Sequence, residues 1–93
     1  MKIRIRVAGF LGNRPLHLEG LVELEQGLSF KKILKPADRS PAFKNYPCLQ
    51  EIFRQKIQPT VLINGDSLPL PEGLNYRLAD GDEITIVTAL AGG

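Results

Sequence analysis

Histidine and cysteine are almost absent from the sequence, which holds one of each, His17 and Cys48. A single cysteine excludes an internal disulfide and a cysteine-based metal cluster. His17 falls on the polar side of a segment that alternates polar and apolar residues, so we expect an exposed side chain rather than a general base. Cys48 follows Pro47 at an expected helix start, where a lowered pKa is one interpretation and a small buried apolar side chain is the commoner one.

The sequence also lacks the patterns that common catalytic sites require. It contains no visible carboxylate pair, no metal-ligand spacing and no glycine-rich phosphate loop. We therefore expect no metal site, no bound cofactor and no catalytic residue. The protein is expected to act beside partner enzymes rather than as an enzyme itself.

Long apolar runs and a strong net charge are missing as well. The longest apolar stretches, such as residues 59–63, fall far short of the ~20 residues that span a bilayer. Residues 1–6 alternate charged and apolar side chains, where a signal peptide is continuously apolar. We expect a cytoplasmic protein without a membrane partner. A net charge of +2 is too small to indicate nucleic-acid binding.

The composition that is present describes one small globular domain with unevenly distributed charge. Its 93 residues are 43% hydrophobic and 24% charged, which allows a single core. Residues 1–60 hold eleven Lys or Arg against five Asp or Glu, whereas residues 61–93 hold one against five. The last third can therefore steer the protein toward a basic partner. Ordinary solvated charge is the alternative interpretation.

Alternating side chains at the start of the chain predict a β-hairpin. Residues 2–9 place apolar side chains on one face and charged ones on the other, with period two. Residues 16–24 continue the same alternation, and glycine, asparagine and proline in residues 9–15 supply a turn. The apolar face of this hairpin consists of Ile3, Ile5, Val7, Leu16, Leu18, Val22 and Leu24.

Two helices are expected in the middle of the chain. The first is capped by Ser29 and is expected to end early, at Pro36. Residues 36–47 contain three prolines and no period, which predicts an irregular loop before a second, short helix. The apolar face of the first helix consists of Phe30, Ile33 and Leu34, and that of the second of Leu49, Ile52 and Phe53.

The last third predicts the remaining strands. Residues 60–63 are a short apolar strand that ends at Asn64-Gly65, a pair that tolerates the positive φ angles of a tight hairpin turn. Residues 68–78 indicate a weak edge strand and loop, and residues 83–88 a final strand with Ile84 and Ile86 pointing inward. The whole order predicts an α+β fold, a mixed sheet of about four to five strands with one main helix and a second short helix.

The chain ends in Gly92-Gly93, a pair that occurs at a terminus by chance in roughly one protein in two hundred at a usage of ~7%. Glycine has no Cβ, so such a tail can thread a narrow channel and bring its carboxylate to the phosphorus of a nucleotide. Once adenylated, the acyl carbon can be attacked by a sulfur or nitrogen nucleophile. We expect residues 1–88 to form the domain and residues 89–93 a flexible tail; an incidental terminus is the alternative.

Three segments together resemble the second half of the MoaD/ThiS family of ubiquitin-like sulfur carriers. They are Pro-Thr-Val-Leu-Ile-Asn-Gly at 59–65, Leu-Ala-Asp-Gly-Asp-Glu-Ile-Thr-Ile at 78–86, and Ala-Gly-Gly at 91–93. The resemblance implies the β-grasp, ubiquitin-like fold and a C-terminal thiocarboxylate. It also implies an E1-like adenylating enzyme of the MoeB/ThiF type, which consumes ATP, and a sulfur donor such as a cysteine desulfurase or a rhodanese.

Within the family, the longer chain looks more like the small subunit of molybdopterin synthase than the thiamine-thiazole carrier. This resemblance implies that Gly93 is the site of adenylation and thiocarboxylation. It implies a large synthase subunit of the MoaE type as partner, in molybdenum or tungsten cofactor synthesis. The implied tail threaded into that partner is Leu90, Ala91 and Gly92, and the implied docking residues are Val87, Arg4 and Arg6.

Three other functions remain open. The same tail serves sulfur delivery to thiamine or cysteine synthesis equally well. In a protein modifier, a lysine amine instead of sulfide would capture the adenylated Gly93. In a plain β-grasp interaction module the glycines would be incidental, and the partner would bind the strand face of Lys2, Arg4 and Arg6.

Overall fold

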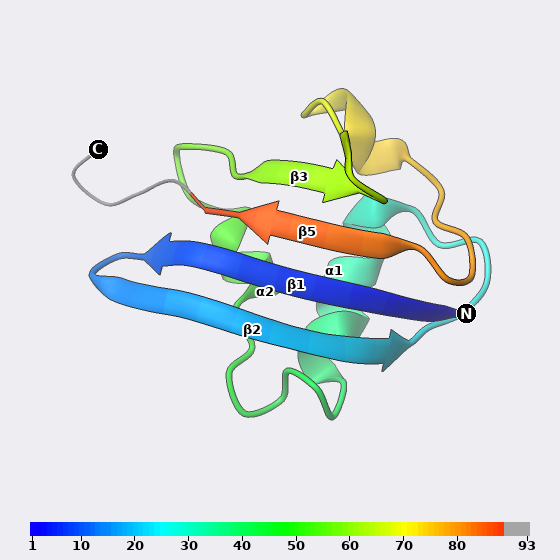
Figure 1. Cartoon of the computed structure of the whole chain (residues 1–93), viewed down its shortest axis with the longest axis horizontal. Coiled ribbons are helices and arrows are strands. Elements are labelled where there is room, and N and C mark those ends of the chain that lie inside the picture. Colours follow the sequence, from blue (N-terminus) through cyan, green and yellow to red (C-terminus); the bar gives the residue numbers. More distant parts are fainter. Residues whose placement is uncertain (89–93) are drawn as a thin grey trace.

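The computed structural model describes residues 1–88, which form a five-stranded mixed sheet with helices on one side (Figure 1). The expected tail, with Leu90, Ala91, Gly92 and Gly93, lies outside the described residues. The strands lie in the order β2-β1-β5-β3-β4. The elements are β1 (Lys2–Leu11), β2 (Arg14–Glu23), α1 (Phe30–Arg39), α2 (Leu49–Ile52), β3 (Thr60–Ile63), β4 (Asp66–Ser67), the 3₁₀ helix η1 (Glu72–Asn75) and β5 (Glu83–Val87).

The last strand of the described chain lies at the centre of the sheet. β5 pairs in parallel with β1, where Ile5 faces Ile84, and antiparallel with β3, where Val61 faces Ile86. β1 and β2 form the predicted antiparallel hairpin. The α+β class, the mixed sheet and the two helices expected from the sequence are confirmed.

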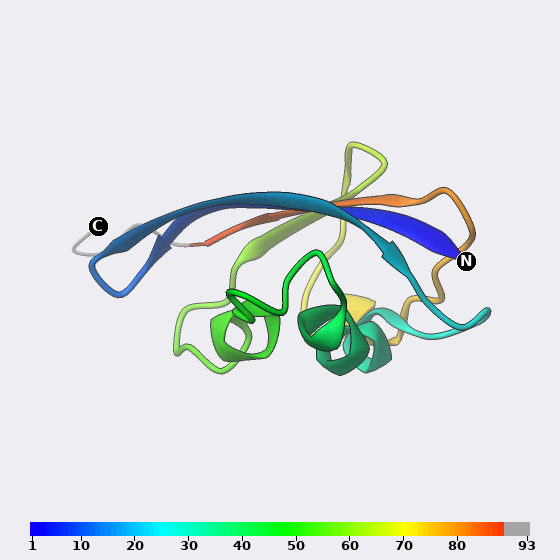
Figure 2. The ribbon, with the colours of Figure 1, turned by 90° about the horizontal axis from the view of Figure 1, so that it is seen from below.

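The core lies between the sheet and the two helices, which cover the same face (Figure 2). Alternation along β1 and β5 buries every second side chain, so Ile5 and Ile84 are almost fully enclosed. Each fully buried side chain of this size contributes about 1.5–3 kcal/mol to stability. No described element covers the opposite face of the sheet (Figure 2), which we call the open face. None of the helices in residues 1–88 is long and apolar enough to cross a bilayer.

The expectation that Pro36 ends the first helix is wrong, because α1 continues to Arg39. A proline inside a helix lacks the N–H that bonds to the carbonyl four residues earlier, which costs about 3 kcal/mol. Beyond Pro36 the helix buries Ala37, and the Asp38 carboxylate accepts hydrogen bonds from the N–H groups of Leu49 and Gln50. Hydrogen bonds to a charged group contribute about 1.5–3 kcal/mol each, which offsets the cost of the proline. Ser29 is the N-cap residue as predicted, although its hydroxyl makes no capping hydrogen bond.

The edge strand is shorter and earlier than expected. β4 comprises only Asp66 and Ser67, opposite Ile63 and Leu62, and the segment expected as a weak strand contains η1 instead. Prolines at positions 69 and 71 have no N–H to donate to a ladder, so pairing stops before them. Such a short edge strand offers little backbone for unwanted pairing with other chains.

Two of the segments that resemble the carrier family, residues 59–65 and 78–86, form hydrogen bonds with each other around the start of β5. Asn64, at a φ of +52°, donates a side-chain hydrogen bond of 2.9 Å to Asp82 and accepts one of 2.9 Å from the N–H of Glu83. Asp82 also accepts from the N–H of Ala79 at 2.8 Å and is 8% exposed. These residues therefore fix where β5 begins, at the end of the sheet opposite to Thr88.

Candidate functional site

The end of β5 is held against β1 by Thr88, the last residue that the structure describes. The Thr88 N–H donates to the carbonyl oxygen of Ala8 at 2.9 Å, which extends the parallel pairing beyond β5. Its hydroxyl accepts a hydrogen bond from the N–H of Phe10 and donates one to the Phe10 carbonyl oxygen, both at 2.6 Å. We call this arrangement the Thr88 latch. It fixes the point from which residues 89–93 continue.

Gly9 makes the latch possible because it lies directly against Thr88. Its φ of +120° is a conformation that other residues rarely adopt. A Cβ atom added to Gly9 would lie 2.3 Å from the Thr88 hydroxyl oxygen and 2.6 Å from its carbonyl oxygen. Both the backbone angle and the close approach therefore require glycine. Sequence reasoning assigned Gly9 to a turn and missed this contact, which joins residues far apart in the chain.

Val87 points away from the core, onto the open face, as the alternation of β5 predicts. It is 41% exposed and lies between Ala8 of β1 and Thr60 of β3. Phe10 at the end of β1 is 36% exposed. Apolar side chains therefore surround the point where the chain leaves the sheet, although the docking role of Val87 stays a prediction.

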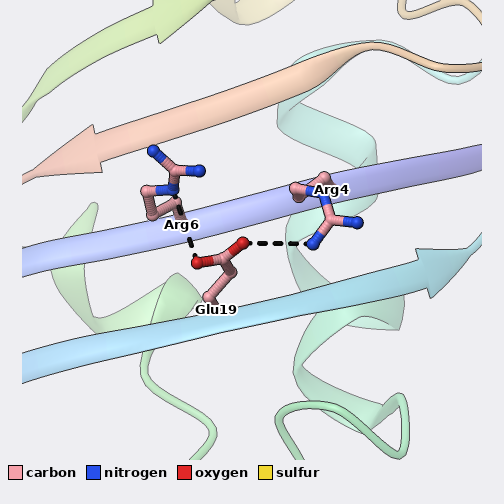
Figure 3. A network of polar contacts seen from close by, with 3 residues as sticks. All are labelled: Arg4, Arg6 and Glu19. Atoms are coloured by element: carbon pink, nitrogen blue, oxygen red, sulfur yellow. Dashed lines mark hydrogen bonds and ion pairs between the residues drawn. The ribbon is translucent and has the colours of Figure 1, made fainter.

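Arg4 and Arg6 project from β1 onto the same open face, and Glu19 of β2 binds both (Figure 3). Glu19 oxygens lie 3.1 Å from a terminal nitrogen of Arg4 and 3.6 Å from Nε of Arg6. All three side chains are 42–48% exposed, and exposed pairs contribute about 0–1 kcal/mol. Glu19 therefore holds the two arginines only weakly, and the docking role of Arg4 and Arg6 stays a prediction. Sequence reasoning missed Glu19, although the hairpin register that pairs it with Arg6 was predictable.

The two scarce side chains do not form a reactive site. His17 is exposed on β2, as expected, and lies opposite Ala8. Cys48 is fully buried, and burial, with the charges of Asp38 and Glu51 adding, raises the pKa of its thiol to about 11. A thiol that stays protonated near neutral pH is a poor nucleophile, so the structural interpretation of Cys48 is the correct one. Within residues 1–88, no group of His, Cys, Asp or Glu could hold a metal ion.

Comparison with known proteins gives one family and several structural likenesses. The model of the ThiS family matches residues 16–93. No curated protein matches the sequence.

Three solved structures share the β-grasp fold over nearly the whole chain, at identities that show the fold alone. A chain of the complex of subunits 1 and 2 of the molybdopterin-converting factor from Helicobacter pylori 26695 is 16% identical, with a TM-score of 0.54 and full coverage of both chains. The small archaeal modifier protein 1 from Methanosarcina acetivorans is 23% identical, with a TM-score of 0.54, and the match covers 99% of this chain and 96% of that one. The HVO 2177 protein from Haloferax volcanii is 17% identical, with a TM-score of 0.55 and coverage of 99% and 88%.

Proposed function

Because this chain belongs to the ThiS family of ubiquitin-like sulfur carriers, we propose that it delivers sulfur from a thiocarboxylate at Gly93 during synthesis of molybdopterin, the molybdenum and tungsten cofactor. Proteins of this family are small carrier subunits that work with partner enzymes. In the proposed cycle an E1-like enzyme of the MoeB/ThiF type joins the Gly93 carboxylate to AMP and releases pyrophosphate from ATP. The persulfide of a cysteine desulfurase or a rhodanese then attacks the acyl carbon and displaces AMP, which gives an acyl disulfide with the donor. A second thiol of the donor or of an added reductant cleaves this disulfide, so the Gly93 thiocarboxylate is released and the two thiols form a disulfide.

The Thr88 latch is the observation that supports this proposal most directly. It holds the end of the described body against β1, and five residues follow it, Ala-Leu-Ala-Gly-Gly. An extended chain spans at most ~3.3–3.6 Å per residue, so these five can carry the Gly93 carboxylate about 17 Å beyond the latch. In our proposal residues 1–88 are the body, and Leu90, Ala91 and Gly92 pass through a channel of the partner.

The proposed sulfur acceptor is a cyclic pyranopterin, which receives the sulfur in a complex of this chain with a large subunit of the MoaE type. The open face offers exposed Val87 beside the latch and two arginines whose pairing with Glu19 is weak. Support also comes from the similar Helicobacter pylori chain, whose structure is a complex of subunits 1 and 2 of the molybdopterin-converting factor. A partner with an apolar patch and nearby carboxylates fits this face. The proposal implies a cytoplasmic site of action.

The experiment is an intact-mass measurement after incubation with ATP, an activating enzyme and a sulfur source. We expect a mass change equal to replacement of one oxygen by sulfur. The same incubation without ATP, and with a chain that lacks Gly93, should leave the mass unchanged. An unchanged mass for the full chain with an activating enzyme that adenylates other family members would overturn the proposal.

A second candidate function is protein modification, favoured by the likeness to the small archaeal modifier protein 1. In that case a lysine amine would displace AMP and form an isopeptide bond with Gly93. The two functions share the activated intermediate and differ in the nucleophile. Lysine adducts in cells that express the full chain, absent from cells that express the chain without Gly93, would support modification. Delivery to thiamine or cysteine synthesis would use the same thiocarboxylate with another acceptor.

A further inference from the structure

The loop between α2 and β3 exposes an unusual apolar side chain. Ile57 is 65% exposed, more than any other large hydrophobic residue among residues 1–88. Arg54 and Lys56, three and one positions before it in the chain, are also exposed. Residues 52–65 contain no acidic residue that could balance these charges locally. An isolated surface isoleucine needs no explanation, but one that follows two cations without an ion pair among residues 1–88 is a recognisable combination of apolar anchor and basic rim.

A cleft with a volume of about 670 Å³ lies between the end of α1 and α2, next to this loop. Its basic lining residues are Arg39, Lys44 and Arg54, all exposed. Arg54 therefore belongs both to the cleft and to the loop, three residues before Ile57. Within residues 1–88 the ion pairs formed are those of Glu19 with Arg4 and Arg6, and the cations of the cleft take part in none.

The acidic residues that line the cleft do not balance its positive charge. Asp38 is 6% exposed, and its carboxylate accepts hydrogen bonds from the N–H groups of Leu49 at 2.8 Å and Gln50 at 3.0 Å, at the start of α2. The Asp38 carboxylate is therefore directed toward the start of α2. Glu51 is the one exposed carboxylate among the lining residues. The surface formed by the cleft and Ile57 thus keeps an excess of positive charge.

We propose that the cleft and Ile57 form a second docking surface, which binds an acidic protein segment that carries an apolar side chain. The carboxylates of that segment would pair with Arg39, Lys44 and Arg54, and its apolar side chain would cover Ile57. An inorganic or nucleotide phosphate would satisfy the cations but would leave Ile57 exposed to water, so a protein segment fits the whole surface better.

This surface lies on the helix side of the sheet, away from the open face that carries Val87 (Figure 2). The loop joins β3 at Thr60, which pairs with Val87, so both surfaces approach the end of the sheet from which residues 89–93 continue. A carrier bound through its open face therefore still presents the second surface. The inference goes beyond the proposed function, because it does not depend on the chemistry of Gly93.

The test is a titration of the isotopically labelled full chain with a short acetylated and amidated peptide in which Asp and Glu surround a Leu-Leu pair. NMR signals of residues 39, 44 and 54–57 should shift, and added salt should weaken the binding, because the charges are exposed. Ile57→Ser and Arg54→Glu should each weaken it about tenfold. Leu21→Ser is the matched control, since Leu21 is 54% exposed on the other side of the sheet, and it should bind the peptide like the parent chain.

Four results would overturn the inference. The first is the absence of shifts at these residues with millimolar peptide, and the second is a set of shifts confined to the open face. The third is equal binding by the Ile57→Ser variant. The fourth is an equal response to inorganic phosphate alone, which would reduce the surface to a simple anion site. Because the peptide binds without ATP or any activating enzyme, failure here leaves the proposed sulfur transfer untouched.

Discussion

At the residue scale, Gly9 and Thr88 show how much of the candidate site depends on a contact between chain ends. The hydrogen bonds of the Thr88 hydroxyl join residues that are 78 positions apart. The alternation of each strand and the hairpin of β1 with β2 are visible in the sequence, but the pairing of β5 with β1 is not. The sequence therefore predicts the outward position of Val87 and does not predict the Thr88 latch, which requires β5 to lie beside β1.

Gly9→Ala should destabilise the protein more than Gly12→Ala. Both residues have positive φ, at +120° and +63°, but an added Cβ meets nothing within 4 Å at Gly12 and meets Thr88 at 2.3 Å at Gly9. We expect a loss of about 1 kcal/mol for Gly12→Ala and about 3 kcal/mol for Gly9→Ala. Urea denaturation measures both values. Equal losses would mean that the close contact with Thr88 does not constrain Gly9.

Thr88→Val should weaken the latch while it preserves the shape of the side chain. The substitution leaves the N–H and carbonyl of Phe10 without the hydroxyl that satisfies them. The expected loss is about 1–3 kcal/mol, with faster hydrogen exchange at the Phe10 amide. Thr88→Ser keeps the hydroxyl and should retain slow exchange at that amide. If serine and valine accelerate exchange equally, the hydroxyl is not the group that holds the end of β5.

Cys48 should make stability depend on pH in alkaline solution. Burial holds the pKa of the folded thiol at about 11, whereas an unfolded thiol ionises near pH ~8.5. Between these values the unfolded state loses a proton that the folded state keeps, so the free energy of unfolding falls as pH rises.

Urea midpoints at about pH 8 and about pH 10.5 measure this dependence. In Cys48→Ala the fall between the two should be smaller than in the parent chain, whatever the absolute stability of the variant. Identical falls in the two proteins would show that the thiol ionises as readily when folded as when unfolded.

At the element scale, the strands were more predictable than the helix. Period-two alternation locates β1, β2 and β5, and Asn64-Gly65 identifies the turn before β4. The end of α1 was not predictable in the same way, because Pro36 is a local signal against the helix while the packing of Ala37 on the core is a tertiary signal for it. The hydrogen bonds that Asp38 accepts from the start of α2 add to this packing, and together these tertiary contacts offset the cost of the proline.

Pro36→Ala should therefore stabilise the protein. Alanine restores a helical N–H, worth up to about 3 kcal/mol relative to proline, and loses about 0.4–1 kcal/mol through the greater freedom of the unfolded chain. We expect a net gain of about 2 kcal/mol in the free energy of unfolding. Pro41→Ala, at an exposed residue beyond α1, is the control and should give no gain. A destabilised Pro36→Ala variant would mean that the proline ring itself contributes to packing.

At the scale of the whole molecule, some acidic side chains of the last third of the sequence form hydrogen bonds within the fold, and the others contribute only surface charge. Asp80 accepts a hydrogen bond of 2.6 Å from the N–H of Lys2, and Asp82 accepts from Asn64 and Ala79. These carboxylates lie near the start of β5, whereas Thr88 lies at its end. If these charges steer the protein toward a basic partner, they do so from the end of the sheet that is far from Thr88. The sequence predicts the sign of this charge but not its position.

The central claim is that Gly93 carries the sulfur while the body holds and presents it. The most direct measurement is fragmentation of the intact protein in a mass spectrometer after incubation with ATP, an activating enzyme and a sulfur source. We predict that fragments containing residue 93 carry sulfur in place of one oxygen and that all fragments ending before it keep their original mass. Sulfur added to fragments that contain Cys48, with an unmodified terminus, would contradict the account.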